Sequence, residues 1–198
     1  MTPDPFQHVD EVFDFRHSLD HETDRGCALM AAAYLSDQLE LLLRLTLIDD
    51  KDVIDELLRP LSPLGSFSGR IEMCYALGLL ASQTRRDLHL IRKIRNDFGH
   101  VAKILTFAEP AISARCRELR HSVHEAEASP RAKFTNSVLG ICGAVHGCIS
   151  TAVHSEVPSD FDMEEVQRGV LEFVRSVTAE TIGKSPLPED PKSEKLDG

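Results

Sequence analysis

Residues 85–100 read RRDLHLIRKIRNDFGH, and this stretch decides the fold that we expect. On a helical wheel its apolar side chains fall on one face and its basic and amide side chains on the other. The apolar face, continued by one more turn, consists of Leu88, Ile91, Ile94, Phe98 and Val101. The polar face consists of His89, Arg92, Lys93, Asn96 and His100. The stretch therefore predicts an amphipathic helix that buries its apolar face against other helices.

The rest of the chain repeats this helical periodicity. Leu35, Leu39, Leu42 and Leu43 follow the i, i+4, i+7, i+8 spacing inside residues 22–48. Proline and glycine clusters separate the apolar segments, and no segment shows the alternation of apolar and polar residues that is typical of a strand. Seven helices are expected, at residues 22–48, 51–58, 69–82, 85–107, 110–123, 134–154 and 161–182. The expected fold class is therefore all-α, a single bundle of about six to seven helices.

The ends of the chain differ in composition from this helical part. Residues 1–20 are acidic and contain two prolines, so they are expected to form an N-terminal arm or a short helix. The helical domain is expected to span residues 21–183. Residues 184–198 are charged and proline-rich, a composition that favours disorder.

Helix starts are indicated by residues with capping side chains. Thr23 or Asp24 can cap the helix that follows them, and Ser66 or Ser68 can cap a later one. Thr84, with Asp87 three residues further on, has the pattern of a capping box at the start of the basic helix.

Length and charge exclude several classes of protein. A chain of 198 residues suits one domain. Its net charge of −10 argues against binding of DNA through the phosphates. No apolar run approaches the ~20 residues of a membrane span, and the acidic N-terminus lacks the basic and apolar regions of a signal peptide. The protein is therefore expected to be cytoplasmic and to have no contact with a membrane.

Neither cysteines nor histidines form a recognisable metal site. The five cysteines are widely spaced and include no C-x-x-C pair, so they are expected to be small buried apolar residues. His121 and His124 stand at i, i+3 spacing before Glu125 and Glu127, which would make half of a zinc site. No second half follows, so a solvated helix face is expected there. The sequence predicts no metal and no cofactor.

The basic helix is an exception in an acidic chain. Residues 85–103 carry six basic side chains against two acidic ones, which indicates either a solvated basic face or a recognition surface. Arg95 lies at the seam between the apolar and polar faces, so its guanidinium is expected to be partly covered and to need a partner. The candidate partners are Asp24, Glu22 and Glu72.

The segment SPLGSFSGR, residues 62–70, predicts a tight loop before a helix. Gly65 allows a sharp turn, Ser66 and Ser68 offer hydroxyls, and Arg70 stands just inside the helix start. A helix N-terminus with a nearby arginine favours anions. Alternatively, the loop only caps and connects two helices.

The R-N-x-x-x-H pattern of Arg95, Asn96 and His100 resembles the R-x(4–6)-H signature of HEPN domains. These domains are helical bundles, many of which dimerise and cleave RNA without a metal. The resemblance implies that His100 moves a proton while Arg95 stabilises the charged phosphorane and Asn96 orients them. Alternatively, Asn96 and His100 are part of a polar helix face and Arg95 is an ion-pair anchor.

Three longer blocks resemble the mannitol operon repressor (MtlR) family, in the order and spacing of that family. The blocks are ETDRGCALMAAAYLSDQLELLL (22–43), SPLGSFSGRIEMCYALGLL (62–80) and RDLHLIRKIRNDFGH (86–100). Gly99 and Ser62 depart from the family pattern, and a mid-helix glycine costs about 1 kcal/mol relative to alanine. The resemblance implies an all-helical regulator of mannitol-type operons that lacks a helix-turn-helix. It also implies work through protein partners such as the phosphocarrier HPr.

Strong polar residues of these blocks are expected to converge on one pocket between helices. The candidates are Asp24, Arg25, Ser66, Arg70, Glu72, Arg92, Arg95, Asn96 and His100. We therefore expect a homodimeric, repressor-type regulator of a sugar or polyol operon that binds a protein partner rather than DNA. One alternative is a HEPN-like endoribonuclease, with RNA as its substrate. A further alternative is direct operator binding through the helix at residues 85–103.

Overall fold

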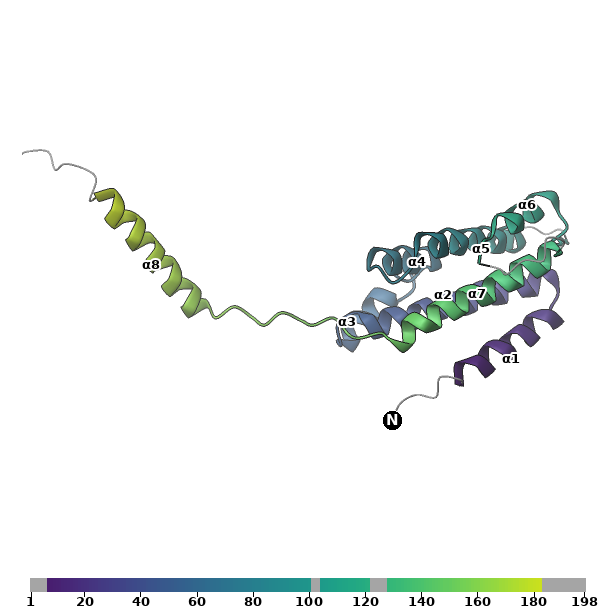
Figure 1. Cartoon of the computed structure of the whole chain (residues 1–198), viewed down its shortest axis with the longest axis horizontal. Coiled ribbons are helices and arrows are strands. Elements are labelled where there is room, and N and C mark those ends of the chain that lie inside the picture. The colour runs from purple at the N-terminus through teal and green to yellow at the C-terminus, as the bar shows by residue number, and fades with distance from the viewer. Residues whose placement is uncertain (1–6, 101–103, 122–127, 183–198) are drawn as a thin grey trace, which may run out of the picture. The chain divides into compact units, whose positions relative to one another are not determined.

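The computed structural model describes residues 7–100, 104–121 and 128–182. Contacts within the chain define two units, Met1–Glu156 and Val157–Gly198, and each is described by itself. The described residues form eight helices and no strand (Figure 1), which confirms the expected all-α class. The number of helices exceeds the expected six to seven because the N-terminal segment is also helical.

Seven helices build the first unit. They are α1 (Gln7–His21), α2 (Asp24–Thr46), α3 (Lys51–Leu58), α4 (Phe67–Ala76), α5 (Ser82–His100), α6 (Pro110–Glu118) and α7 (Pro130–Ser150). Helix α2 is central, because it contacts α1, α4, α5 and α7. The two long helices α2 and α7 run side by side, and α4 and α5 cover another side of α2 (Figure 1).

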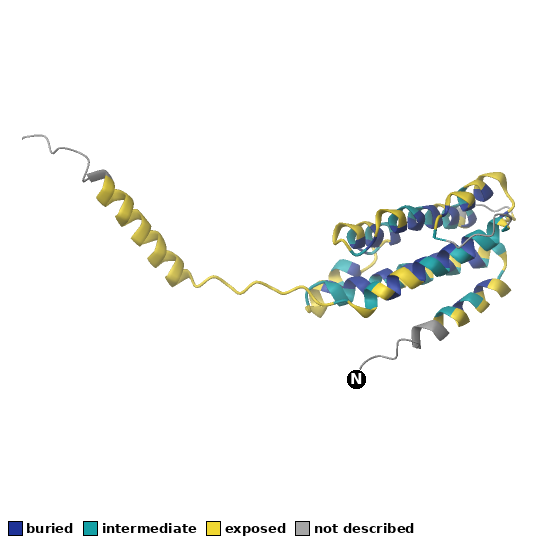
Figure 2. Ribbon diagram, in the orientation of Figure 1, coloured by how far each residue is buried: buried dark blue, intermediate teal, exposed yellow. Residues whose placement is uncertain are grey.

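The apolar face of α5 is buried, as the wheel predicted, while Val101 lies outside the described residues. The fully covered side chains of this face are Leu88, Ile91, Ile94 and Phe98. The Phe98 ring packs against Phe107, and Phe107 against Phe134 of α7, with ring centroids 5.1 and 5.0 Å apart. Each such side chain contributes about 1.5–3 kcal/mol through burial. This packing fixes the rotation of α5, and with it the direction of its polar face (Figure 2).

Of the two possibilities left open for the N-terminal segment, the structure shows a helix, α1. Phe15 and Leu19 are buried, and the Phe15 ring stacks on Tyr34 of α2 with centroids 4.0 Å apart. Helix α1 therefore contributes Phe15 and Leu19 to the core of the bundle. Residues 1–6 lie outside the described residues, as does the expected disordered tail.

The boundary between α4 and α5 falls earlier than expected. Helix α4 stops at Ala76 because Gly78 takes a φ of +73°, a left-handed conformation that glycine adopts without strain. Helix α5 then begins at Ser82. The capping-box prediction was therefore wrong, since Thr84 and Asp87 lie inside α5 and not at its start.

Asp87 instead anchors the segment that follows α6. Its Oδ2 atom accepts hydrogen bonds from the backbone N–H groups of Arg120 (2.7 Å) and His121 (3.0 Å). The same oxygen lies 2.9 Å from Nδ1 of the His121 ring, and Oγ1 of Thr84 lies 3.0 Å from Nε2. Gly140 of α7 permits this docking, because a Cβ there would lie 2.3 Å from the His121 carbonyl oxygen. The prediction of a solvated His121 was wrong, since its side chain is only 16% exposed.

The second unit contains α8 (Met163–Ile182), close to the helix expected at residues 161–182. Oδ1 of Asp162 accepts hydrogen bonds from the N–H groups of Glu164 (2.9 Å) and Glu165 (3.2 Å), which caps the helix. The large apolar side chains of α8 from Met163 to Val177 are exposed (Figure 2). Among the helices that the structure describes, none is long and apolar enough to cross a membrane.

Candidate functional site

A surface groove of about 530 Å³ lies where α2, the start of α4 and α5 meet. Its lining residues are Leu29, Ala32, Ala33, Ser36, Asp37, Gly65, Ser66, Phe67 and Arg95. Helix α2 supplies small and apolar side chains at helical spacing, followed by a hydroxyl and a carboxylate. Helix α5 supplies the guanidinium of Arg95. The groove therefore combines an apolar wall with charges of both signs.

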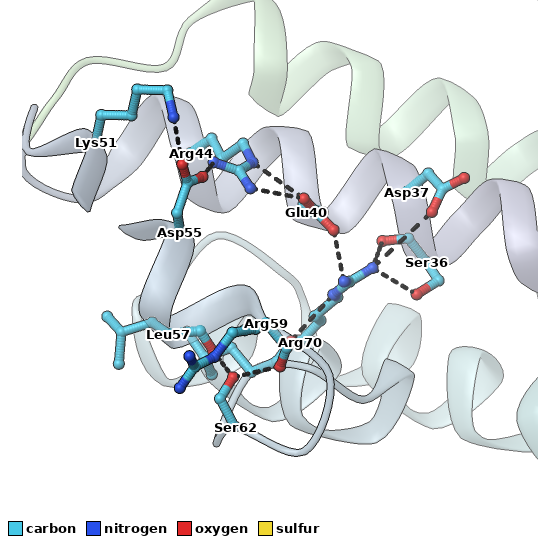
Figure 3. A network of polar contacts seen from close by, with 11 residues as sticks. Ser36, Asp37, Glu40, Arg44, Lys51, Asp55, Leu57, Arg59, Ser62 and Arg70 are labelled. Atoms are coloured by element: carbon cyan, nitrogen blue, oxygen red, sulfur yellow. Dashed lines mark hydrogen bonds and ion pairs between the residues drawn. The ribbon is translucent and has the colours of Figure 1, made fainter. Parts of the chain in front are cut away.

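Arg70 supports this groove from inside the protein (Figure 3), and only 8% of the residue is exposed. Its Nε donates to the Leu64 carbonyl oxygen at 3.1 Å. Its Nη1 donates to the carbonyl and hydroxyl oxygens of Ser36, at 3.1 and 2.9 Å. Its Nη2 lies 2.5 Å from the Glu40 carboxylate, and its Nη1 lies 3.9 Å from Oδ1 of Asp37. Because all three nitrogens have acceptors, Arg70 anchors α4 to α2 and is not an open ligand-binding group.

Further ion pairs extend this network from α2 to α3 (Figure 3). Glu40 accepts a hydrogen bond from Nε of Arg44 at 3.0 Å, and Nη1 of Arg44 donates to Asp55 at 2.7 Å. Lys51 pairs with the same carboxylate. Hydrogen bonds from the Lys51 and Arg44 side chains lower the pKa of Asp55 below its ordinary value. The network thus holds α2, α3 and α4 around one loop.

The loop before α4 has the sharp turn that its glycine predicted. A Cβ on Gly65 would lie 2.1 Å from the Arg59 carbonyl oxygen, so a larger residue does not fit without a shift of the backbone. Ser66 caps α4, because its hydroxyl accepts a hydrogen bond from the N–H of Gly69 at 3.0 Å. Ser66 also lines the groove. The backbone of this loop therefore sets the shape of one groove wall.

Arg95 is half-buried and lines the groove, and it has no hydrogen bond or ion pair with any residue that the structure describes. Two of the partners expected for it are engaged elsewhere. Asp24 pairs with Arg131 at 2.6 Å, and Glu72 accepts two hydrogen bonds of 3.0 Å from Arg85. The expectation of a covering carboxylate from these residues was wrong. A guanidinium in this state keeps five N–H donors for a ligand.

Ion pairs elsewhere on α5 confine the local positive charge to a small patch. The arginines of its first turns pair with Glu72 and Glu118. Arg92, three residues before Arg95 and on the same side of α5, has an Nε atom that is buried without a hydrogen-bond partner in the described part of the chain. Lys93 is exposed and lies on the other side of the helix.

The other predicted site residues surround the groove rather than line it. Arg25 is exposed and lies on the groove side of α2, one turn before the first lining residue. Asp24 accepts a hydrogen bond from the N–H of Phe107 at 2.9 Å and serves as an internal anchor. Asn96 is half-buried beside Arg95. The side chain of His100 lies outside the described residues, so the structure describes only part of the R-N-x-x-x-H pattern.

Leu29, Ala32 and Ala33 were missed as site residues, although a signal for them was present. The run ALMAAA at residues 28–33 holds more apolar positions than the buried stripe of α2 needs. Leu29 is the member of this run that is 39% exposed. Surplus apolar residues of this kind indicate a surface that receives a partner.

The thiols and histidines follow a structural pattern. The free cysteines are Cys27, Cys74, Cys116, Cys142 and the partly buried Cys148. Burial raises the pKa of Cys27 to about 11 and that of the other three buried thiols to about 12, so these thiols are neutral at pH 7. His124, Glu125 and Glu127 lie outside the described residues. Within residues 7–100, 104–121 and 128–182, no group of three or more His, Cys, Asp and Glu side chains could hold a metal.

The groove lies within the part of the chain that matches a known protein family. The family model described as "Mannitol repressor" (MtlR) matches residues 11–139, a span that includes α2, α4 and α5. The solved structure titled "X-ray structure of the MtlR-HPr complex from Escherichia coli" has a similar fold. Its TM-score is 0.58 at 18% identity, over 70% of this chain and 98% of that chain. No curated protein matches the chain. Because the family model covers well over half of the 198 residues, the chain belongs to the mannitol repressor (MtlR) family.

Proposed function

We propose that the chain is a repressor-type regulator of a sugar or polyol operon that acts through a protein bound in the groove of α2, α4 and α5. The observation that carries this proposal is Arg95, a partly covered guanidinium with no partner in the described chain, beside an apolar wall. Keeping a guanidinium half-buried is costly unless a ligand completes its hydrogen bonds. Membership of the mannitol repressor family supports the regulatory role.

The partner that we propose is a phosphocarrier protein of the HPr type, because the solved relative is a complex with HPr. The groove chemistry favours a protein surface, since apolar and small residues dominate its lining. An occupant would place apolar side chains against Leu29 and Ala33. It would offer a hydrogen-bond acceptor to Arg95 and a donor to Asp37. A partner of this kind would be met in the cytoplasm.

Direct operator binding has less support. The net charge is −10, and the arginines at the start of α5 are already paired with Glu72 and Glu118. A protein that binds DNA through its phosphates needs a continuous basic surface, and its affinity for DNA falls steeply as the salt concentration rises. Contact with the operon through a protein partner therefore fits the described surface better.

Isothermal titration calorimetry with purified HPr from the same organism tests this proposal. Arg95→Glu and Lys93→Glu reverse one charge each, two positions apart on the same helix. We expect Arg95→Glu to weaken binding by at least about tenfold, because it opposes a carboxylate to the acceptor of the partner. Lys93→Glu should stay within about twofold, because Lys93 lies on the other side of α5 and does not line the groove. Absence of binding by the wild type, or equal loss in both variants, would contradict the proposal.

One observation supports the endoribonuclease alternative: the guanidinium of Arg95, next to Asn96, has no partner among the residues that the structure describes. A metal-independent ribonuclease would cleave RNA in the presence of EDTA, and His100→Ala would abolish the cleavage. We expect no cleavage by either protein. Cleavage by the wild type that disappears in His100→Ala would make the enzyme the preferred function.

A further inference from the structure

One side of helix α8 is a stripe of exposed apolar side chains. Within the described part of Val157–Gly198, no other residue covers this stripe. The exposed members of the stripe are Met163, Val166, Val170, Phe173, Val174 and Val177. On a helical wheel these positions span an arc of about 100°. The charged side chains on the opposite half are Glu164, Glu165, Arg168, Glu172 and Arg175, and Leu171 lies there as well. Such a continuous apolar surface on a soluble helix marks an interaction site.

The stripe has the spacing of a coiled-coil seam. Met163, Val170 and Val177 are separated by seven residues and occupy a positions. Val166 and Phe173 occupy d positions, and the last d position, near the end of the helix, holds Glu180. Valine at a positions favours two parallel strands. The flanking e and g positions hold Gln167, Gly169, Val174, Ser176 and Thr181. None of these flanking residues is charged, so the only like charges that two parallel copies would bring together in the described seam are those of Glu180, at its C-terminal end.

We propose that α8 pairs with the α8 of a second copy of this chain as a short parallel coiled coil, and that this pairing makes the protein a dimer. The proposal does not depend on the partner of the groove. Residues 163–182 follow the span matched by the family model, which ends at residue 139. The pairing element is therefore an addition to the part of the chain that defines the family.

Two other occupants of the stripe have less support. The exposed large apolar residues of the bundle of the same chain, such as Phe13, Leu41 and Val53, lie on three different helices. A membrane surface is disfavoured because α8 carries four glutamates and two arginines, whereas helices that bind anionic bilayers are rich in lysine and arginine.

Light scattering after size exclusion of the full chain tests the proposal. We expect a mass of twice 22.0 kDa at high concentration and dissociation on dilution, because a seam of less than three heptads gives weak pairing. Val170→Glu puts a charge in the seam and should give a monomer at every concentration. Leu171→Glu is the matched control, because it introduces the same charge at the next residue, outside the stripe. It should remain a dimer.

Cysteine cross-linking tests whether the two α8 helices run parallel. In a parallel pair, two copies of position 170 face each other, so Val170→Cys should form a disulfide-linked dimer on mild oxidation. Leu171→Cys, and the wild type with its five native thiols, should not. A wild type that stays monomeric overturns the proposal. So does a dimer that survives Val170→Glu, or a monomer that binds anionic vesicles through α8. Circular dichroism showing an intact bundle in Val170→Glu excludes unfolding as the cause.

Discussion

Arg70 and Arg95 belong to adjoining helices beside the same groove, yet their surroundings are opposite. The three nitrogens of Arg70 all have acceptors, which include the carbonyl of Leu64, both oxygens of Ser36 and the carboxylate of Glu40. Arg95 is also partly covered, but no described residue accepts a hydrogen bond from it. The contrast teaches that the partners of a buried cation, and not its residue type, decide whether it serves the fold or a ligand.

The largest effect is expected at the partnered arginine. Arg70→Met keeps the apolar stem but removes the charge, which leaves the Leu64 carbonyl oxygen without its donor and Glu40 with Arg44 alone. We expect a loss of about 4 kcal/mol in the free energy of unfolding, because removing one partner of a buried ion pair is strongly destabilising. Urea denaturation measures it. The control is Arg59→Met, which removes an exposed pair with Glu56 and should cost less than about 1 kcal/mol. Similar losses in the free energy of unfolding for both variants would contradict the structural role assigned to Arg70.

A second buried anchor should show a smaller loss. Asp87 is fully buried and its Oδ2 receives two backbone N–H groups and the His121 ring. Asp87→Asn keeps an oxygen acceptor but removes the charge, so we expect a loss of about 2 kcal/mol by urea denaturation. Asp97→Asn, on the same helix with a part-exposed carboxylate, should lose less than about 1 kcal/mol. An unchanged Asp87→Asn would show that the segment after α6 is held by other contacts.

The exposed ion pair of Glu72 and Arg85 should have an effect on stability between those of Arg70 and Arg95, and this effect should depend on pH. Arg85 and then His89 lower the pKa of Glu72 below its ordinary 4.5. Because the folded pKa lies below the unfolded one, the stabilisation is present above about pH 4.5 and is lost as the pH falls through the folded value. The stability difference between wild type and Glu72→Gln should therefore shrink with acidification. Thermal unfolding from neutral to acidic pH measures it, and a constant difference would refute the assignment.

The smallest effect on stability is expected at the unpartnered arginine. Arg95→Ala removes no interaction with any residue that the structure describes, so the free energy of unfolding should change by less than about 0.5 kcal/mol. Denaturation under the conditions used for Arg70→Met gives a direct comparison. A loss of about 2 kcal/mol or more would mean that Arg95 already has a protein partner.

The sequence predicted the buried side of α5 because helical periodicity records which face meets a core. Leu88, Ile91, Ile94 and Phe98 are all covered as expected. The sequence also predicted the sharp turn at Gly65, since only glycine allows the close approach found there. These features depend on local geometry, which neighbouring residues determine.

Partners that lie far apart in the chain could not be predicted in the same way. Arg70 finds Ser36 across 34 positions, and Asp87 finds His121 across 34. The capping pattern of Thr84 and Asp87 was misleading because α5 begins at Ser82, the residue at which the preceding helix was expected to end. Tertiary contacts replaced a plausible local interaction in each case.

Arginine side-chain NMR tests the central contrast most directly. In the free protein, the Nε–Hε signal of Arg70 should exchange slowly with water, because it donates to the Leu64 carbonyl oxygen, whereas that of Arg95 should exchange rapidly. On addition of HPr, the Arg95 signal should shift and become protected while the Arg70 signal stays in place. A protected Arg95 signal in the free protein, or a shift confined to Arg70, would contradict the account.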